Sequence, residues 1–333
     1  MNGRAIVIRG DARALPLPDA SVDLICTSPP YWALRDYRDG GESLKGQIGA
    51  EASPQEYLES LWECTREWMR VLKPEGSIFV VLGDKYSDRA DGGPASAQSW
   101  REDRAGCMPP GRSSTAMAPR KSRLMLPERY RIGCLDLGLL VRAVIIWSKP
   151  SAMPERVTDR VRNVHEDIVH LTKLPRYYAA IDEIRTPASG YARKPGARRA
   201  TPPGQRRRAM ADTVNPLGAP PSSVWEIASQ PLKVPDHLND DHYAAFPPAL
   251  VRPIVLGWSP DDGVVLDPFG GSGTTALVAA AFGRRGVTTD LSAGYCRLAQ
   301  WRTTDPGERA RALDVPRPPS LVDGQAALFG ESA

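Results

Sequence analysis

Short apolar runs recur along most of the chain, and each is bounded by polar, glycine or proline residues. Runs of this length between turn-forming residues are typical of buried β-strands. We expect strands at residues 4–12, 21–26, 77–84, 141–149, 166–173, 263–269 and 285–291.

A second spacing, with apolar residues three or four positions apart, predicts helices between several of these strands. Ser53 and Glu56 have capping-box spacing, and Pro54 stands at the first helical position. This helix is expected to stop at the sequence KPEG, residues 73–76, and further helices are expected at 127–140, 274–283 and 293–302. The alternation predicts an α/β fold with a doubly wound, mostly parallel sheet.

Three stretches have no period. Residues 85–123 are rich in Gly, Pro, Ser and Arg and predict a long mobile loop. Residues 185–222 form a second irregular insert, and residues 306–333 are expected to be a disordered tail. We therefore interpret 1–184 and 223–305 as two parts of one domain.

The sequence TSPPYW, residues 27–32, follows the second expected strand directly. Because Pro29 and Pro30 lack N–H groups and fix their own φ, the strand must end in a stiff turn. The turn presents Ser28, Tyr31 and Trp32 and could hold a flat ligand. Taken alone, however, the pattern favours an ordinary strand exit.

A glycine-rich turn, DPFGGSGTT at residues 267–275, joins a late strand to a helix. It lacks the lysine of a P-loop and the GxGxxG spacing of a dinucleotide site. A third interpretation is an S-adenosyl-L-methionine site. Asp267 would then face the ammonium group of the cofactor, the glycines would pass under its methionine and ribose, and Asp290 would hold the ribose.

Together, DPFGGSGTT and TSPPYW resemble the DNA methyltransferases that modify an exocyclic amine, cytosine N4 or adenine N6. The tetrad SPPY, residues 28–31, comes early and the cofactor motif late, which is similar to the permuted β group of that family. The resemblance spans about residues 4–302 and includes VLKPEGSIFVVLGD, IIWSKPSAMPERVTDRVRNVHE, KLPRYY and HYAAFP. HEDIVHL departs from it, since relatives tend to carry an aromatic residue after His-Glu. The next departure, TTD in place of the commoner GID, keeps Asp290.

The resemblance implies a Rossmann-like methyltransferase sheet, with irregular inserts for DNA recognition, that binds S-adenosyl-L-methionine and double-stranded DNA. Catalysis is implied for Ser28, Pro29, Pro30 and Tyr31. The Ser28 hydroxyl and the Pro29 carbonyl would accept hydrogen bonds from the target amine, and Tyr31 would stack on the flipped base. Trp32 would either wall the same pocket or pack in the core.

Cofactor contacts are implied at both ends of the chain. Asp11 would lie beside the adenine, and His242 and Phe246 would pack against the methionine end. The full implied set is Asp11, His242, Phe246, Asp267, Pro268, Phe269, Gly270, Gly271, Gly273, Thr274 and Asp290. His165 and Glu166 resemble a conformational buttress, with a general-base role for His165 as the alternative.

An exocyclic amine is a poor nucleophile because its lone pair is delocalised into the ring. Acceptors that localise the lone pair and aim it at the sulfonium methyl supply catalysis by positioning. No metal is needed. Methylation of a ring carbon would need a cysteine, which typically follows a proline in such DNA enzymes, and the chain has no Pro-Cys pair. In this family serine at the first tetrad position goes mostly with cytosine, so cytosine N4 is expected, with adenine N6 as the alternative.

Charge is unevenly distributed, although the net charge is only +4. Between residues 185 and 210 there are many Arg and Lys residues and no Asp or Glu. Such a segment can contact phosphates and order on binding. We expect DNA contacts from Trp32, Arg193, Lys194, Arg198, Arg199, Arg206, Arg207 and Arg208, and the arginine-rich 85–123 loop is a second candidate.

Composition adds limits on location and partners. No apolar run approaches the ~20 residues of a membrane span, and the first residues do not resemble a signal peptide. The five scattered cysteines contain no CxxC, which disfavours structural zinc and favours a reduced, cytoplasmic setting.

Two alternative functions stay open: a methyltransferase for RNA or protein glutamine, and a catalytically silent DNA-binding subunit. In a restriction-modification system the partner would be a cognate restriction endonuclease, whereas a solitary methylase has none. The pattern sets neither the recognition sequence nor the oligomeric state.

Overall fold

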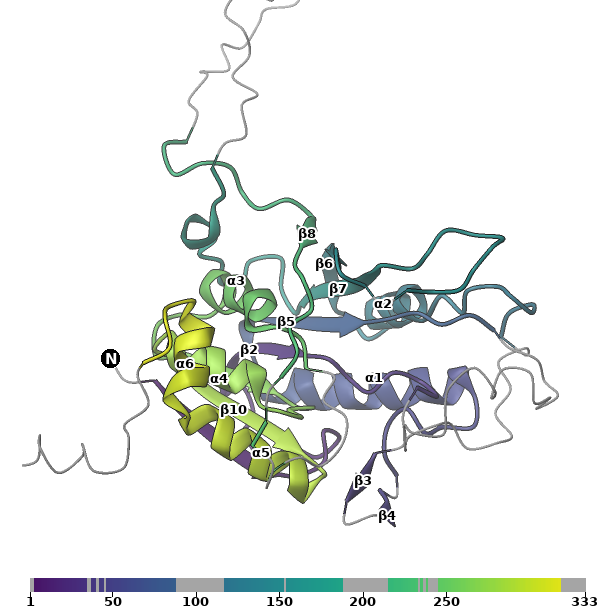
Figure 1. Ribbon diagram of the computed structural model, residues 1–333, viewed down its shortest axis with the longest axis horizontal. Helices are drawn as coiled ribbons and strands as arrows, with labels where there is room; N and C mark the ends of the chain where they lie inside the picture. The colour runs from purple at the N-terminus through teal and green to yellow at the C-terminus, as the bar shows by residue number, and fades with distance from the viewer. Residues whose placement is uncertain are drawn as a thin grey trace, which may run out of the picture.

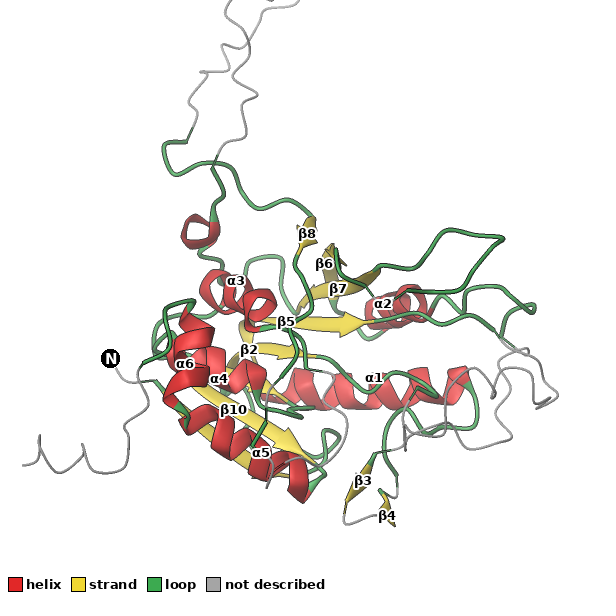
Figure 2. Cartoon of the chain, viewed as in Figure 1, coloured by secondary structure: helices red, strands yellow, loops and turns green. Residues whose placement is uncertain are grey.

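A computed structural model describes residues 3–34, 37–39, 42–44, 46–87, 117–152, 154–187, 215–232, 234–235, 238 and 245–318. The chain forms one large twisted sheet with helices on both faces, which confirms the predicted α/β class (Figures 1 and 2). The sheet has eight strands in the order β1-β10-β9-β2-β5-β7-β6-β8. Their bounds are β1 Arg4–Arg9, β2 Val22–Thr27, β5 Leu72–Leu82, β6 Leu140–Ser148, β7 His165–Thr172, β8 Val224–Glu226, β9 Val264–Asp267 and β10 Arg285–Asp290.

Strand direction decides where functional residues meet. Strand β7 is antiparallel to its neighbours β5 and β6, while the other neighbouring pairs in this sheet are parallel. The sheet is therefore mostly parallel, as predicted. Because parallel strands end at the same edge, the residues after β1, β2, β9 and β10 are brought together there.

The helices form two layers around the sheet. Helices α1 (Pro54–Val71) and α2 (Leu126–Asp136) pack on one face. Helices α3 (Pro248–Trp258), α4 (Thr274–Ala281) and α6 (Pro306–Leu313) pack on the other, and α5 (Ala293–Thr304) packs against the edge strand β1. Alternate residues of β2 divide between the two cores, with Ile25 on the α1 side and Leu24 and Cys26 on the α3 side.

Helix α1 begins as the sequence predicts and ends directly before the KPEG segment, but the strand that follows begins earlier than expected. The Ser53 hydroxyl accepts from the Glu56 N–H at 3.2 Å, and Pro54 is the first helical residue. The helix stops at Val71, and the KPEG segment already lies in strand β5. The pairing of β2 with β5 shifts register between Val22 and Leu24, because Pro74 has no N–H to give to the ladder.

Two helices were missed by sequence reasoning. Helix α3 contains Pro248 and Pro253, and these prolines hid its helical period. Helix α6 lies where a disordered tail was expected, so that expectation is wrong for Pro306–Leu313. Asp305 caps α6 by accepting from the Glu308 N–H at 2.8 Å, and tertiary contacts stabilise the short helix. Among the helices of the described ranges, none is long and apolar enough to cross a bilayer.

Candidate active site and cofactor pocket

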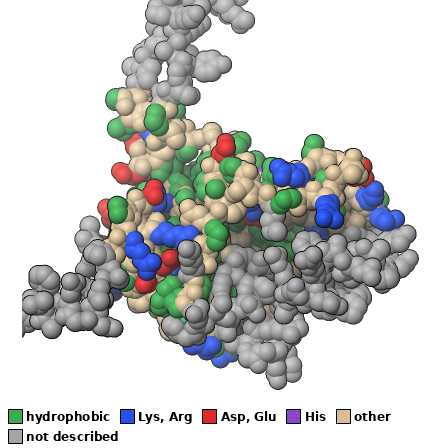
Figure 3. All heavy atoms as spheres, in the orientation of Figure 1, with side chains coloured by type: hydrophobic (Ala, Val, Ile, Leu, Met, Phe, Trp, Pro, Cys, Tyr) green, Lys and Arg blue, Asp and Glu red, His purple; other side chains and the backbone are tan. Residues whose placement is uncertain are grey.

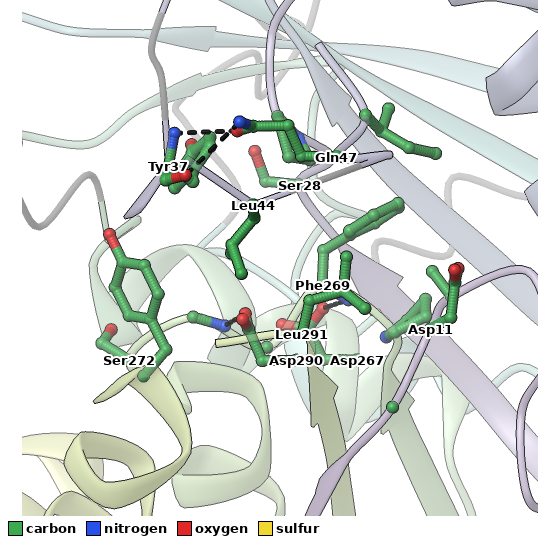
Figure 4. Close-up of a pocket in the computed structure, with 18 of the residues that line it drawn as sticks. Asp11, Ser28, Tyr37, Leu44, Gln47, Asp267, Phe269, Ser272, Asp290 and Leu291 are labelled. Carbon is green, nitrogen blue, oxygen red and sulfur yellow. Dashed lines mark hydrogen bonds between the residues drawn. The ribbon is translucent and has the colours of Figure 1, made fainter. Parts of the chain in front are cut away.

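A pocket opens at the edge of the sheet where β1, β2, β9 and β10 end (Figure 4). Asp11, Ser28, Asp267 and Asp290 follow or end these four strands, and all four line the pocket. The two sequence motifs also touch directly, because the Thr27 hydroxyl donates to Asp267 Oδ1 at 2.6 Å across 240 residues of sequence. The tetrad and the glycine-rich motif thus form one site.

Asp267 is the buried acid of this pocket, with 1% of its surface exposed. Thr27 and the Phe269 N–H donate to Oδ1, and the Thr275 hydroxyl donates to Oδ2 at 3.0 Å. Burial raises the pKa of Asp267 to about 6, although these hydrogen bonds oppose the shift. A carboxylate held in low dielectric is suited to a cationic group in the adjacent cavity.

The glycines of the motif are required by close packing. A Cβ on Gly270 would lie 1.6 Å from the Thr288 hydroxyl of β10. Gly273 has φ +75° and would bring a Cβ within 2.9 Å of Ala299 on α5. Only glycine lets the turn approach β10 and α5 this closely while it leads into α4.

Two further carboxylates border the pocket, and both are held by hydrogen bonds. Asp290 Oδ2 accepts from the Gly271 N–H at 2.9 Å, so the acid at the end of β10 braces the glycine turn. Asp11 is clamped by the Arg13 guanidinium, with Nη2 at 2.6 Å from Oδ2. Burial would raise the pKa of Asp11, but the hydrogen bonds from Arg13 outweigh it and lower that pKa below its usual range. Asp11 therefore stays charged.

One wall of the pocket comes from a segment that sequence reasoning missed. Tyr37, Leu44 and Gln47 face Asp267 and Asp290 across the cavity (Figure 4). Gln47 Oε1 accepts from the Tyr37 N–H at 2.8 Å, which ties together the two ends of the hairpin formed by β3 (Arg38–Asp39) and β4 (Glu42–Ser43). The Tyr37 ring lies 6.2 Å from that of Tyr295 on α5. The sequence feature that could have indicated this wall is the presence of Tyr37 and Gln47 among polar residues soon after the tetrad.

Hydrogen bonds to helix α1 and to the segment before it hold the tetrad turn in place. The Tyr57 hydroxyl donates to the Pro30 carbonyl at 2.9 Å. The Ala33 N–H donates to the Gly49 carbonyl at 2.8 Å, and the Trp32 indole N–H donates to the Glu51 carbonyl. These bonds leave Ser28 at the pocket, while Pro29 is buried.

Tyr31 connects the tetrad to β7. Its hydroxyl donates to Glu166 Oε2 at 2.8 Å, and Lys149 donates to the other oxygen of Glu166. Burial raises the pKa of Tyr31 well above its usual range, and the Glu166 carboxylate adds to the shift, whereas a hydrogen bond with Ser28 opposes it. The phenol therefore stays protonated. One ring face packs on Gly83, where a Cβ would lie 2.7 Å from Cε2.

Trp32 differs from the expectation of a DNA contact. Only 2% of its surface is exposed, and it belongs to the core on the α1 side of the sheet. Lys85 lies over its ring at 5.3 Å. The side chain is buried because the turn after Pro30 points it inward, so Trp32 is a packing residue and cannot touch DNA.

Eleven of the 23 predicted site residues meet at the pocket, and the others adjoin it, lie in the core as Trp32 does, or fall outside the described residues. Those that line it are Asp11, Ser28, Pro30, Phe246, Asp267, Pro268, Phe269, Gly270, Gly271, Thr274 and Asp290. Pro29, Tyr31 and Gly273 adjoin this lining through the chain. His242 and the basic residues Arg193, Lys194, Arg198, Arg199, Arg206, Arg207 and Arg208 lie outside the described residues.

The residues of the pocket fit S-adenosyl-L-methionine. Asp267 offers a buried carboxylate for an ammonium group, and Gly271 lines the same cavity at a point where a Cβ would meet no other atom within 4 Å. Phe246, Phe269 and Tyr295 offer apolar walls for flat or thioether groups. Across the described ranges, no cluster of three His, Cys, Asp or Glu residues is placed to hold a metal ion.

Comparison with known proteins leads to the same class. The chain is 34% identical over 305 residues to the type II methyltransferase M.SmaI of Serratia marcescens, covering 89% of each chain. It is 32% identical to M.Cfr9I of Citrobacter freundii, covering 90% of this chain and 87% of the relative.

Solved structures share the fold. A putative DNA modification methylase from Thermus thermophilus, complexed with S-adenosyl-L-methionine, has a TM-score of 0.53 and 25% identity, covering 93% and 96% of the two chains. The cytosine-N4-specific PvuII DNA methyltransferase has a TM-score of 0.60 at 19% identity, covering 94% and 92%.

The sheet order, the glycine-rich turn and the tetrad define a methyltransferase that uses S-adenosyl-L-methionine. Residues 22–301 match the DNA methylase family of N6 and N4 amino-methyltransferases, and the chain belongs to that family. The predictions of this family, of the cofactor and of DNA methylation are confirmed.

Proposed function

We propose that this enzyme transfers a methyl group to N4 of a flipped cytosine at a specific DNA site, as the methylase of a type II restriction-modification system. The observation that carries the choice of base is Ser28 at the first tetrad position, at the rim of the cofactor pocket. Serine offers a short, neutral acceptor, whereas aspartate would bring a charge and a longer side chain. The relatives named type II methyltransferases support the biological setting.

Bound S-adenosyl-L-methionine supplies an electrophilic methyl group on a sulfonium. The Ser28 hydroxyl and the Pro29 carbonyl accept hydrogen bonds from the target amine and localise its lone pair. Asp267 and the glycine turn would hold the cofactor. The methyl group would pass to the amine nitrogen and leave a neutral thioether that keeps the C–S electron pair, and the proton released by the amine would pass to solvent water. The free face of the Tyr31 ring stacks on the base, which offsets part of the few kcal/mol that flipping costs.

Target recognition is the role we propose for residues 185–222. The arginines of this insert would contact phosphates and order on the duplex. In this arrangement residues 1–184 and 223–305 form a single catalytic domain, and recognition is carried by an insert between its two halves. The insert is where related enzymes would differ in the sequence they methylate.

Nucleoside analysis tests the target base. DNA from a host expressing the enzyme is digested to nucleosides and examined by mass spectrometry, with DNA from a host expressing Ser28→Ala as the control. We expect N4-methylcytosine, and a loss of roughly 10²–10³ in rate for Ser28→Ala, as for removal of one positioned hydrogen-bonding group. N6-methyladenine in place of methylcytosine would overturn the base, and 5-methylcytosine would overturn the amine mechanism.

A further inference from the structure

Two segments outside the pocket project from the same edge of the sheet. Residues 150–164 connect β6 to β7, and residues 117–123 precede α2. In Figure 1 both segments extend past α2. The first of these loops starts directly after Lys149 and ends two residues before Glu166, the carboxylate that bonds both Lys149 and the Tyr31 hydroxyl. It therefore begins and ends beside the tetrad.

Specific contacts join these segments into one surface. Lys121 Nζ lies 2.8 Å from Asp159 Oδ2, which ties the two segments together. The Arg160 guanidinium lies 3.9 Å from the centre of the Tyr86 ring and also pairs with Glu155. The Ser87 N–H donates to the Ser122 carbonyl at 2.8 Å. Both loops are thus attached to the end of β5 and to each other.

The basic side chains of this surface divide into two kinds. Lys121, Arg123 and Arg160 are paired with Asp159, Asp84 and Glu155. Arg120, Arg156 and Arg162 are exposed, and none forms a hydrogen bond or ion pair with any residue within the described ranges. Figure 3 shows Lys and Arg side chains gathered at this end of the molecule. The paired residues fix the surface, and the unpaired ones face solvent.

We propose that Arg120, Arg156 and Arg162 form a backbone clamp that binds phosphates of the duplex beside the flipped base. The proposal rests on DNA methylation and is independent of which base is modified. A nucleotide in the pocket stays attached to its strand, so phosphates on either side of it must pass this edge of the sheet. Duplex DNA carries about one charge per 1.7 Å, and exposed arginines on a fixed loop meet it with little loss of backbone freedom.

Salt-dependent binding tests the clamp. The full-length protein and the double variant Arg156→Ala/Arg162→Ala are titrated with a short duplex of arbitrary sequence at several salt concentrations. The slope of log K against log salt should become shallower by about 1.8, which is 0.9 for each lost contact. Affinity at 0.2 M salt should fall on the order of tenfold. Adding Arg120→Ala should reduce the slope by about 0.9 more.

The control variant is Arg4→Ala/Arg66→Ala. Arg4 starts β1 and Arg66 lies near the end of α1, so both exposed arginines lie toward the opposite edge of the sheet. The control removes the same charge and should leave the slope unchanged. Equal slopes for the wild type and the clamp variant, or an equal change in the control, would overturn the proposal. Neither result bears on the modified base, which nucleoside analysis decides separately.

Discussion

At the scale of single residues, Asp267 has the most consequential electrostatics in the pocket. Burial raises its pKa to about 6, so below that pH the neutral acid is the main form. In the proposed site the ammonium group of S-adenosyl-L-methionine would pair with the charged form, the carboxylate. Between pH 7 and pH 5 we expect affinity for the cofactor to fall, approaching tenfold per pH unit below the pKa.

Calorimetric titration of the cofactor at pH 5, 6 and 7 checks this dependence. Asp267→Asn is the matched control, because it keeps the shape and cannot ionise. It should bind weakly at every pH in the series. A wild-type affinity that is flat across the range, or equal to that of Asp267→Asn at pH 7, would contradict the role of Asp267.

Tyr31 has two separable functions. One face of its ring packs on Gly83, the other is the face proposed to stack on the base, and its hydroxyl joins Ser28 to the pair of Glu166 and Lys149. Tyr31→Phe should keep stacking and lose this connection, so kcat should fall about tenfold while cofactor affinity is unchanged. Tyr31→Ala should lose a further ~1–3 kcal/mol of base stacking.

Single-turnover rates and cofactor titrations of the two variants separate these roles. Glu166→Gln should resemble Tyr31→Phe, because both act on the orientation of the Ser28 hydroxyl. Full activity of Tyr31→Phe would show that the hydroxyl only fills space. An equal loss in Tyr31→Phe and Tyr31→Ala would show that the ring does not stack on the base.

At the scale of elements, helix α6 supports the cofactor turn through Arg302 on α5. Arg302 is 1% exposed, and its Nη1 donates to the hydroxyls of Ser272 and Thr274 at 2.8 and 2.6 Å. Its Nε donates to Glu308 of α6 at 2.7 Å. Ser272 and Thr274 line the pocket. Arg302 therefore holds the glycine-rich turn in place, and Glu308 of α6 neutralises the buried charge of Arg302.

Removing the carboxylate at Glu308 should therefore weaken cofactor binding from outside the pocket. We expect Glu308→Ala to raise KM for S-adenosyl-L-methionine several-fold, to leave KM for DNA unchanged, and to cost about 3 kcal/mol of unfolding free energy. Denaturant unfolding and initial rates measure these quantities.

Asp314→Asn provides the matched control for this prediction. It removes the pair with Arg252 at 3.2 Å, which also joins α6 to the domain but does not reach the turn. The carboxylate of Asp314 is largely exposed, so this change should cost less than about 1 kcal/mol. Equal increases in both KM values for Glu308→Ala would assign α6 a role in general stability only.

At the scale of the whole molecule, one sheet edge carries two adjoining functions. In the proposed function the ends of β1, β10 and β9 would hold the cofactor, while the ends of β2, β5 and β6 and the start of β7 carry the tetrad, Glu166 and the proposed clamp. The two halves join where Thr27 bonds to Asp267. With the proposed roles of these residues, methyl donor and target base would meet without movement of the sheet, because both would be held by the neighbouring strands β2 and β9.

The sequence by itself determined the α/β class, most of the strands and helices, and the two motifs. Apolar period, capping residues and proline turns act over a few neighbouring residues, so they can be interpreted without knowledge of the fold. Asp267 and the glycines were interpreted as a cofactor turn in this way, whereas the role of Ser28 came from the resemblance to the methyltransferase family. Helix α3 was hidden because its prolines mask the local signal, although Pro248 occupies a first-turn position that helices tolerate.

The tertiary structure alone decided how these pieces meet. Strand order, the reversed direction of β7 and the bond between Thr27 and Asp267 depend on contacts between residues far apart in sequence. The same is true of Trp32, whose burial depends on the segment at Gly49–Glu51, and of α6, whose Glu308 is needed by a buried arginine. Local sequence patterns encode the secondary-structure propensity of a segment and which face of the helix or strand is apolar. Burial and charge pairing are set by the partners that folding brings together.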